Sequence, residues 1–469
     1  MIKMKIEDQL KTIEILKNGS AESKIEALSS LESQEFSAKV CEVIADLIKN
    51  EDKGVRNAAT ALIGSNRNAS FPAFVARYIT VNDLSVRNLA GEILINLGSL
   101  SVEPLINFPH HDDNDTLKFI IDVLGLIGDE RASLFILGIL SATENDNVIL
   151  ACLEALGNVK FDGAVDVMIL FYDRNELYKP TIVEALGKIG SKVALEFLVE
   201  RFPNEDELTK YSIVESLGSL GDMNTFFFLL EQMAEINGPM VLPLIRSLSM
   251  LKEKCYLDIP FDNRMKNLLL YTIAEGTPED KKTAFNLIDT FDDKDILGAS
   301  LNLLGEDYEL DELIRSKMYR NTDFIYLEVA RLINQNVPNL RNVLELFLLT
   351  IHYSKEFNLP VNISMVEIRN IVHAVTGLLD HYDEEIRKTA MEILFELDLE
   401  SALLFIDVMA NDENGWNRIR LLEIIENIPG TEFDPVILKF INDEDEMVRE
   451  RAAYAAGIKN ISQLSTNAN

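Results

Sequence analysis

The sequence predicts an all-α fold, a solenoid in which antiparallel helix pairs stack in a line. Three observations support this prediction. Related segments recur about every 31 residues, apolar residues follow the helical spacings of three and four, and the alternation typical of β-strands is absent. Because one helix pair cannot bury its own apolar face, each pair must pack against its neighbours.

Two motifs mark the period. The motif Asp-x-x-Val-Arg occurs in EDKGVRN and NDLSVRN, and its arginines, Arg56 and Arg87, are one period apart. In the C-terminal part, DEEIR and DEMVR place Arg387 and Arg449 two periods apart, and Arg418 lies midway between them. A Leu-Gly motif recurs with nearly the same period, at Gly125, Gly157, Gly187 and Gly218.

Residues 83–110 illustrate one repeat unit. Asp83 stands where an N-cap residue can accept hydrogen bonds from the first free amides of a helix. Gly98 follows the helix, at a position that favours a left-handed residue, and we expect the other repeat glycines at helix ends too. A shorter helix, VEPLINF, has Pro104 near its first turn. One face of the first helix is apolar and comprises Val86, Leu89, Ala90, Ile93, Leu94 and Leu97.

The regularity of the repeat divides the chain into three predicted parts. Residues 1–235 form a regular array, residues 236–375 an irregular helical middle, and residues 376–469 a second regular array. The middle retains helical spacing in MVLPLIRSLSML, NRMKNLLLYTIAE, FIYLEVARLINQ and MVEIRNIVHAVTGLLD. We therefore expect longer, less regular helix pairs there.

The two motifs together resemble short HEAT repeats, the kind found in phycobilisome-lyase-like and many other bacterial HEAT proteins. The resemblance is clear over 51–234, returns over 381–460 and is weak between. It implies a right-handed superhelix whose Val-Arg helices line the concave face. It also implies a structural ladder of hydrogen bonds between adjacent units, formed by Asp52, Arg56, Asp83, Arg87, Asp383, Arg387, Asp445 and Arg449.

The amino-acid composition restricts the kinds of partner that the protein can bind. The chain has 77 acidic and 44 basic residues, a net charge of −33, which disfavours nucleic acid and anionic membrane surfaces as ligands. We find no secretion signal and no stretch of about 18 uncharged apolar residues, so we expect a cytoplasmic protein. The three cysteines form no CxxC motif, and Cys41 and Cys152 lie within apolar helical patterns.

The sequence offers little catalytic chemistry. It contains no P-loop, GxSxG or GxGxxG motif, and no His-Glu dipeptide of the kind that HEAT-type iron hydroxylases use. HHDDND at 110–115 has metal-binding atoms but falls at a predicted turn, where Asp and Asn are common. His373 and His381 lie eight residues apart, too far for one ion on a straight helix. We expect no metal and no cofactor.

An acid recurs four or five residues after the Val-Arg position and should be exposed. Two interpretations are open. Glutamate is a good helix former that suits an exposed position in an acidic protein, or the acids form a track for a basic segment. The candidate partner-binding residues are Glu92, Asp122, Glu154, Glu184 and Glu215, with Glu392 and Glu423 at the same position in the C-terminal array.

Our functional hypothesis is a non-catalytic scaffold or adaptor that binds proteins through an acidic concave face. The alternative, by resemblance alone, is a lyase or isomerase of the phycobilisome-lyase-like kind acting on a bilin-like molecule. Phe226, Phe227 and Phe228 are consecutive and cannot all face one core, so we expect at least one at the surface.

Overall fold

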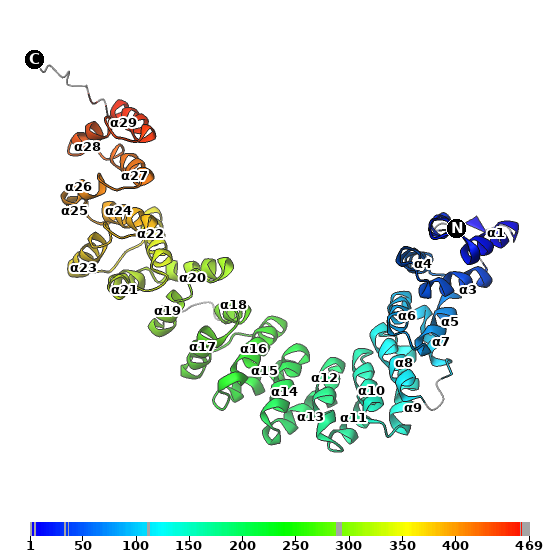
Figure 1. Ribbon diagram of the computed structural model, residues 1–469. Helices are drawn as coiled ribbons and strands as arrows, with labels where there is room; N and C mark the ends of the chain where they lie inside the picture. Colours follow the sequence, from blue (N-terminus) through cyan, green and yellow to red (C-terminus); the bar gives the residue numbers. More distant parts are fainter. Residues whose placement is uncertain are drawn as a thin grey trace, which may run out of the picture. The chain divides into compact units, whose positions relative to one another are not determined.

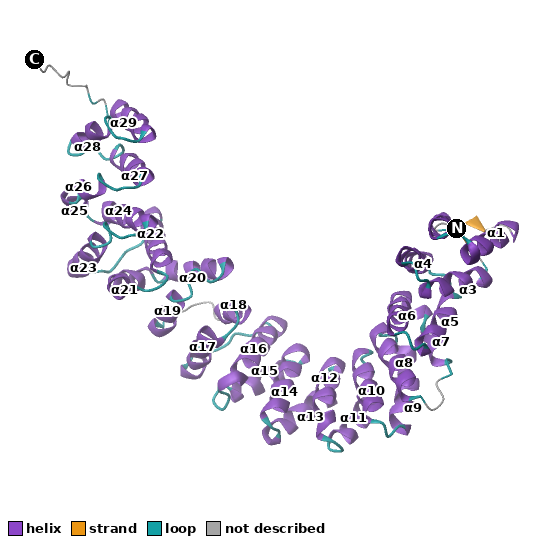
Figure 2. Cartoon of the chain, in the orientation of Figure 1, coloured by secondary structure: helices purple, strands orange, loops and turns teal. Residues whose placement is uncertain are grey.

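The computed structural model describes residues 2–3, 6–31, 34–35, 37–109, 113–287, 293–459 and 461. They form an all-α solenoid of stacked antiparallel helix pairs, as predicted (Figures 1 and 2). The chain comprises two compact units. The first is Met1–Gln232 with Arg246–Leu257, and the second is Met233–Ile245 with Asp258–Asn469. The three-part division at 235 and 375 stays a prediction.

The first unit consists of two layers of helices, each layer packed in chain order (Figure 1). One layer, the first-helix layer, contains α2 (Ala21–Ser30), α4 (Lys53–Asn66), α6 (Leu84–Leu97), α8 (Asn114–Ile127), α10 (Asp146–Asn158), α12 (Lys179–Ile189) and α14 (Glu207–Leu220). The second-helix layer contains α1 (Ile6–Asn18), α3 (Ala38–Asp46), α5 (Phe71–Val75), α7 (Val102–Ile106), α9 (Ser133–Ala142), α11 (Val165–Tyr172), α13 (Lys192–Arg201) and α15 (Met223–Gln232). Most of α16 (Val241–Cys255) also belongs to this unit.

The second unit repeats the two-layer plan. One layer contains α18 (Pro278–Leu287), α20 (Tyr308–Arg320), α22 (Leu340–Glu356), α24 (Glu384–Leu397), α27 (Gly415–Ile425) and α29 (Glu446–Ile458). The other contains α17 (Asn263–Glu275), α19 (Lys294–Leu301), α21 (Thr322–Gln335), α23 (Met365–Thr376), α25 (Leu399–Leu404), α26 (Ile406–Met409) and α28 (Asp434–Phe440). The four helical segments predicted for the middle are confirmed as α16, α17, α21 and α23.

Short elements complete the fold. Two strands, β1 (Ile2–Lys3) and β2 (Gln34–Glu35), pair in parallel, which the sequence analysis did not predict. Strands of two residues are too short to show alternation. The 3₁₀ turns are η1 (Leu47–Lys49), η2 (Ala76–Thr80), η3 (Gly98–Leu100), η4 (Glu130–Ala132), η5 (Asp162–Ala164), η6 (Glu176–Tyr178), η7 (Phe202–Asn204) and η8 (Gly238–Met240).

N-cap residues determine where the helices of the first-helix layer begin. The Asp83 carboxylate accepts hydrogen bonds from the amides of Ser85 and Val86, as predicted. The side chains of Asp52, Asp113, Asn145 and Asp206 cap α4, α8, α10 and α14 in the same way. Each cap satisfies amides that the helix leaves free, and so fixes the residue at which the helix begins.

The repeat glycines were expected at helix ends, and those of the Leu-Gly motif occupy the last turn of their helices. Its glycines lie inside α8, α10, α12 and α14, where consecutive helices touch. A Cβ atom on Gly125 would lie 2.7 Å from the Cβ of Ala155, and one on Gly157 2.7 Å from the Cα of Ala185. Gly187 faces Ser216 and Gly218 faces Ser247 in the same manner. Other glycines, Gly128 and Gly190, form the left-handed ends, with φ of 69° and 66°.

Hydrogen bonds support this close approach. The Ser247 hydroxyl donates to the Val214 carbonyl at 2.8 Å, and the Ser216 hydroxyl donates to the Val183 carbonyl at 3.2 Å. Both serines are buried. A side chain can reach the backbone of the preceding repeat only because no other side chain separates the two helices.

The apolar faces pack as expected. Ala90, Ile93, Leu94 and Leu97 of α6 are buried. In α15, Phe226 is buried, whereas Phe227 is 50% exposed, which confirms that the three consecutive phenylalanines do not share one core. The Phe228 ring packs edge-to-face on Phe202.

We expect Gly157→Ala to destabilise the first unit by about 1–3 kcal/mol, because the new methyl group would overlap the Ala185 backbone of the next helix. The matched control is Gly138→Ala in α9, where no atom lies within 4 Å of the added Cβ. There the better helix propensity of alanine should add about 0.5–1 kcal/mol to the free energy of unfolding. Urea titration followed by far-UV circular dichroism would measure both, and effects of the same sign would contradict the contact.

Candidate functional site

The five predicted acids lie on five consecutive helices of the first-helix layer, α6, α8, α10, α12 and α14. We call this set the carboxylate column: Glu92, Asp122, Glu154, Glu184 and Glu215. Four of its side chains are exposed, and Asp122 is half-buried. The column therefore offers its charge to solvent at one position per repeat.

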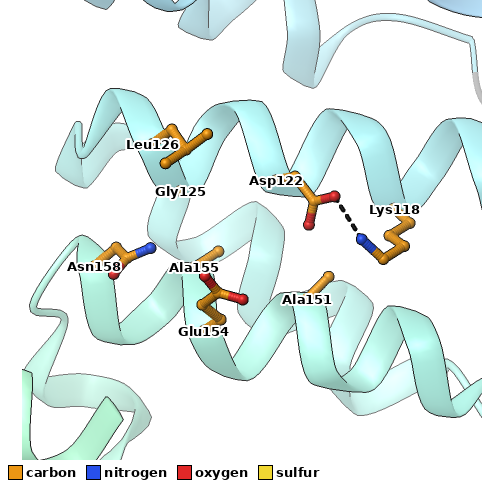
Figure 3. Close-up of a pocket in the computed structure, with 8 residues that line it drawn as sticks. All are labelled: Lys118, Asp122, Gly125, Leu126, Ala151, Glu154, Ala155 and Asn158. Carbon is orange, nitrogen blue, oxygen red and sulfur yellow. Dashed lines mark hydrogen bonds and ion pairs between the residues drawn. The ribbon is translucent and has the colours of Figure 1, made fainter. Parts of the chain in front are cut away.

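A hollow separates two members of the column. Figure 3 shows Asp122 on α8 and Glu154 on α10 across this hollow, which has a volume of about 280 Å³. Lys118 donates to Asp122 at 2.6 Å, one helical turn away. The small residues Gly125 and Ala155 line the same hollow, so the helix contact and the carboxylates are neighbouring features of one surface.

A second hollow of about 410 Å³ lies between α12 and α14 and is lined by Glu184 and Glu215. Lys188 forms an ion pair with Glu184 at 2.6 Å and also donates to Asn158 of α10 at 2.8 Å. Its single ammonium group thus links two repeats and neutralises part of the column.

The i,i+4 spacing within one helix is enough to find Lys118 and Lys188, but it does not find Arg246. This arginine stands one period after Glu215, at the column position of α16, and lies 3.6 Å from the Glu215 carboxylate. Stepping one more period along the sequence would have found it. Glu92 and Glu154 form no ion pair with any residue that the structure describes.

The C-terminal acids differ from those of the column. Arg420 pairs with Glu392 at 2.5 Å and with Glu423 at 2.9 Å. The Glu392 side chain is only 14% exposed. One guanidinium group therefore pairs with both acids and offsets part of their charge, so this part of the second unit presents less free negative charge.

The structure places the four ladder aspartates at N-caps. Asp52, Asp83, Asp383 and Asp445 each accept amide hydrogen bonds from their own helix. The ladder arginines make different contacts. Arg56 and Arg449 donate to carbonyls of the loop before their own helix, and Arg87 donates to the Asp115 carbonyl of the next repeat at 2.9 Å.

Two acids that the sequence did not single out, Asp412 and Asp443, make buried side-chain links between repeats of the second unit. Arg387 donates to both oxygens of Asp412, each at 2.9 Å, and Arg418 donates to both oxygens of Asp443 at 2.9 and 3.0 Å. All four side chains are buried. The signal was the tripeptide Asn-Asp-Glu, which recurs at 411–413 and 442–444 and places its aspartate two residues before each cap.

The pKa of these two carboxyl groups lies below the ordinary value. For Asp412, burial raises the pKa, but hydrogen bonds from Arg387 and Asn417 outweigh burial. For Asp443, burial also raises the pKa, and the bonds from Arg418 and the Asp445 amide outweigh it. Both groups are therefore charged in the folded protein at neutral pH.

The histidines do not assemble a site in the described residues. His110 and His111 lie outside them. His373 is exposed on α23, whereas His381 lies beyond the end of that helix and accepts from the Asp383 amide at 3.1 Å, so the two do not share one helix. Within the described part of the chain, no group of three His, Cys, Asp or Glu side chains could hold a metal ion.

Two of the three thiols have low reactivity. Cys41 and Cys152 are buried, and burial raises the pKa of each to about 12. Cys255 is partly exposed. Because the thiolate is the nucleophile, the buried pair is unreactive at neutral pH and acts as packing, as the sequence indicated.

Comparison with known proteins agrees with this architecture. The family described as HEAT repeats matches residues 133–218. This part of the chain is similar to HEAT repeats. The matched HEAT repeats run from α9 to α14 and include three members of the carboxylate column. No curated protein matches the sequence. No helix among the described residues is long and apolar enough to cross a membrane.

Solved structures with a similar arrangement include importin beta, with 12% identity, a TM-score of 0.41, and coverage of 96% of this chain and 67% of that chain. A homology model of the AP-3 complex has 11% identity, a TM-score of 0.38 and coverage of 96% and 90%. The CpcE–CpcF phycocyanin lyase complex from Nostoc sp. PCC7120 has 16% identity, a TM-score of 0.29 and coverage of 54% and 94%. Similarities of this size carry no functional argument.

We expect Asp412→Asn to destabilise the C-terminal repeats by about 3 kcal/mol at pH 7, because it leaves Arg387 buried beside a neutral group. The folded-state pKa of Asp412 lies below the unfolded value of about 3.9, so its stabilising effect is present above that pH. The effect is lost as pH falls through the folded-state pKa, and the variant should then approach the parent protein.

Urea unfolding followed by the fluorescence of Trp416, the single tryptophan and a residue of α27, would measure this difference. The control is Glu413→Gln, whose side chain is 83% exposed and 3.5 Å from Arg387. It should change the free energy of unfolding by less than about 0.5 kcal/mol. Equal losses for Asp412→Asn and Glu413→Gln would contradict the assigned link.

We expect one of the three thiols, Cys255, to react rapidly with 5,5′-dithiobis(2-nitrobenzoate) in the native protein, and all three after denaturation. The absorbance of the released thiolate counts the reacting groups. Rapid loss of all three without denaturant would show that Cys41 and Cys152 are accessible.

Proposed function

We propose that this protein is a non-catalytic scaffold that binds a basic segment of a protein partner along the carboxylate column. The observation that carries the proposal is the placement of five carboxylates on five consecutive helices of one layer, with hollows between them. The HEAT-repeat solenoid supplies the continuous helical surface that an extended interface requires.

The charge of the column supports a cationic partner. Glu92 and Glu154 have no ion-pair partner among described residues, whereas Asp122, Glu184 and Glu215 each have one cation. Packed helices lie about 8–10 Å apart, so neighbouring carboxylates attract an incoming cation jointly. This arrangement speeds the encounter with a basic segment and fixes its direction along the layer.

The hollows can accommodate side chains of a partner, in addition to the electrostatic attraction that the carboxylates exert. Each hollow holds carboxylates beside small residues, Gly125 and Ala155 in one, Gly187 and Ser216 in the other. A lysine stem needs apolar surface for its methylene groups and an acid for its ammonium group. Each hollow provides both between two consecutive repeats.

An acidic surface also promotes solubility. A test must therefore distinguish the effect of where the column acids lie from the effect of the protein's net charge. We expect the triple variant Glu154→Lys, Glu184→Lys and Glu215→Lys to bind a fluorescent lysine-rich peptide at least about tenfold more weakly than the parent protein, by anisotropy at low salt. The control reverses three exposed acids of the second-helix layer and changes the net charge equally: Glu196→Lys, Glu200→Lys and Glu231→Lys.

The control variant should bind within about twofold of the parent protein, because its altered residues lie on the other layer. Affinity purification at low and high salt, followed by mass spectrometry, would extend the comparison to natural partners. Equal weakening in both triple variants would reduce the effect to net charge and contradict the proposal. Natural partners that still bind the triple variant of the carboxylate column would also contradict the proposal.

A further inference from the structure

The second unit contains a hollow of about 790 Å³ between α19, α20, α21 and the segment after α22. We call it the tyrosine pocket. Its volume falls in the range of about 300–1,000 Å³ that is typical of small-molecule sites. It lies apart from the carboxylate column, in the other compact unit.

Aromatic and aliphatic side chains form its walls. The Tyr319 and Tyr353 rings lie parallel, with centroids 4.1 Å apart and planes inclined by 4°. Phe324 and Leu297, both buried, line the pocket, and Leu327 is 41% exposed within it. An exposed apolar surface beside stacked rings favours a flat apolar ligand, because burial of such a ligand removes both surfaces from water.

Positive charge lines this pocket although the protein carries a net charge of −33. Lys294 and Arg320 both line it. The Lys294 ammonium group makes no hydrogen bond or ion pair with a described residue. The adjacent residues Asp293 and Asp295 both form ion pairs with Lys266, at 2.8 and 2.6 Å.

The one acid in the lining is already engaged. Asp323 accepts a hydrogen bond from the Asn362 amide at 3.0 Å. Two basic side chains face this single carboxylate in the lining, so the local charge favours an anion, with Lys294 as the available ammonium group.

A hydroxyl in the pocket lining offers a further polar contact. Thr322, at the start of α21, lines the pocket and is only 8% exposed. Its hydroxyl forms no hydrogen bond with any residue that the structure describes. A ligand oxygen in the pocket can therefore accept from this hydroxyl without displacing another protein partner.

We propose that the tyrosine pocket binds a small anionic aromatic molecule. Its ring would pack against Tyr319, Tyr353 and Phe324, and its anionic group would pair with Lys294. The Thr322 hydroxyl would donate to a ligand oxygen. The ring contact supplies apolar burial, and the ammonium group selects an acid over a neutral ring of the same shape.

Two probes that share a ring system test this proposal on the full chain. 1-Anilinonaphthalene-8-sulfonate carries an anion, and N-phenyl-1-naphthylamine lacks it. Fluorescence titration of both should show that Lys294→Glu weakens binding of the sulfonate at least about tenfold, and binding of the neutral probe less than about twofold. Lys294→Arg should retain sulfonate binding, because it keeps the charge.

A second variant tests the apolar wall. Leu327→Glu should weaken both probes at least about tenfold, because it places a charge inside the pocket. The matched control is Leu404→Glu in α25, at a leucine that is 78% exposed and outside the pocket, and it should change neither affinity. Circular dichroism would confirm that each variant is folded.

Two results would overturn the proposal. The first is sulfonate binding that neither Lys294→Glu nor Leu327→Glu alters, which would place the probe elsewhere. The second is an equal loss of both probes in Lys294→Glu, which would show that the lysine does not recognise the anion.

Discussion

The close contact between consecutive helices at small residues is the constraint on which the first unit depends. Gly125, Gly157, Gly187 and Gly218 each leave room for only an alanine or serine from the next helix. Packing of this kind brings the leucine and isoleucine side chains on either side into contact, and their burial supplies most of the stabilisation. Each repeat touches only its neighbours, and a contact of this type recurs once per repeat from α8 to α16.

The same contact orders the surface. Because successive helices meet at equivalent residues, the positions one turn earlier also line up, and these positions hold the carboxylates. Gly125 and Asp122 are three residues apart on α8, as are Gly157 and Glu154 on α10. The alignment of the acids follows from the backbone packing, whereas their negative charge does not. A polar uncharged residue would satisfy the fold equally well, and this is why the charge itself supports a binding role.

Much of this structure could be predicted from the sequence. The period of the repeat indicates both how long each helix is and which helix it stacks against. The caps Asp83 and Asp52 and the pair Lys118–Asp122 followed from local rules about helix ends and neighbouring turns. Contacts across repeats were harder. The roles of Gly157, Asp412 and Arg246 depend on which residue of the next helix faces them, and helical spacing within one segment does not contain this information. The tyrosine pocket had no signal at all, because Leu297, Phe324 and Tyr353 come together only through packing of three irregular helices.

The two kinds of link between repeats have different mechanical consequences. A glycine against an alanine is a smooth contact with no directional bond, so two helices can slip a little along one another at small cost. The paired hydrogen bonds of Arg387 with Asp412, and of Arg418 with Asp443, are directional and buried, and even a slight displacement weakens both bonds at once. Under a pulling force, α8 to α12 would therefore yield gradually like a spring, whereas the repeats from α24 to α29 would resist and then break abruptly.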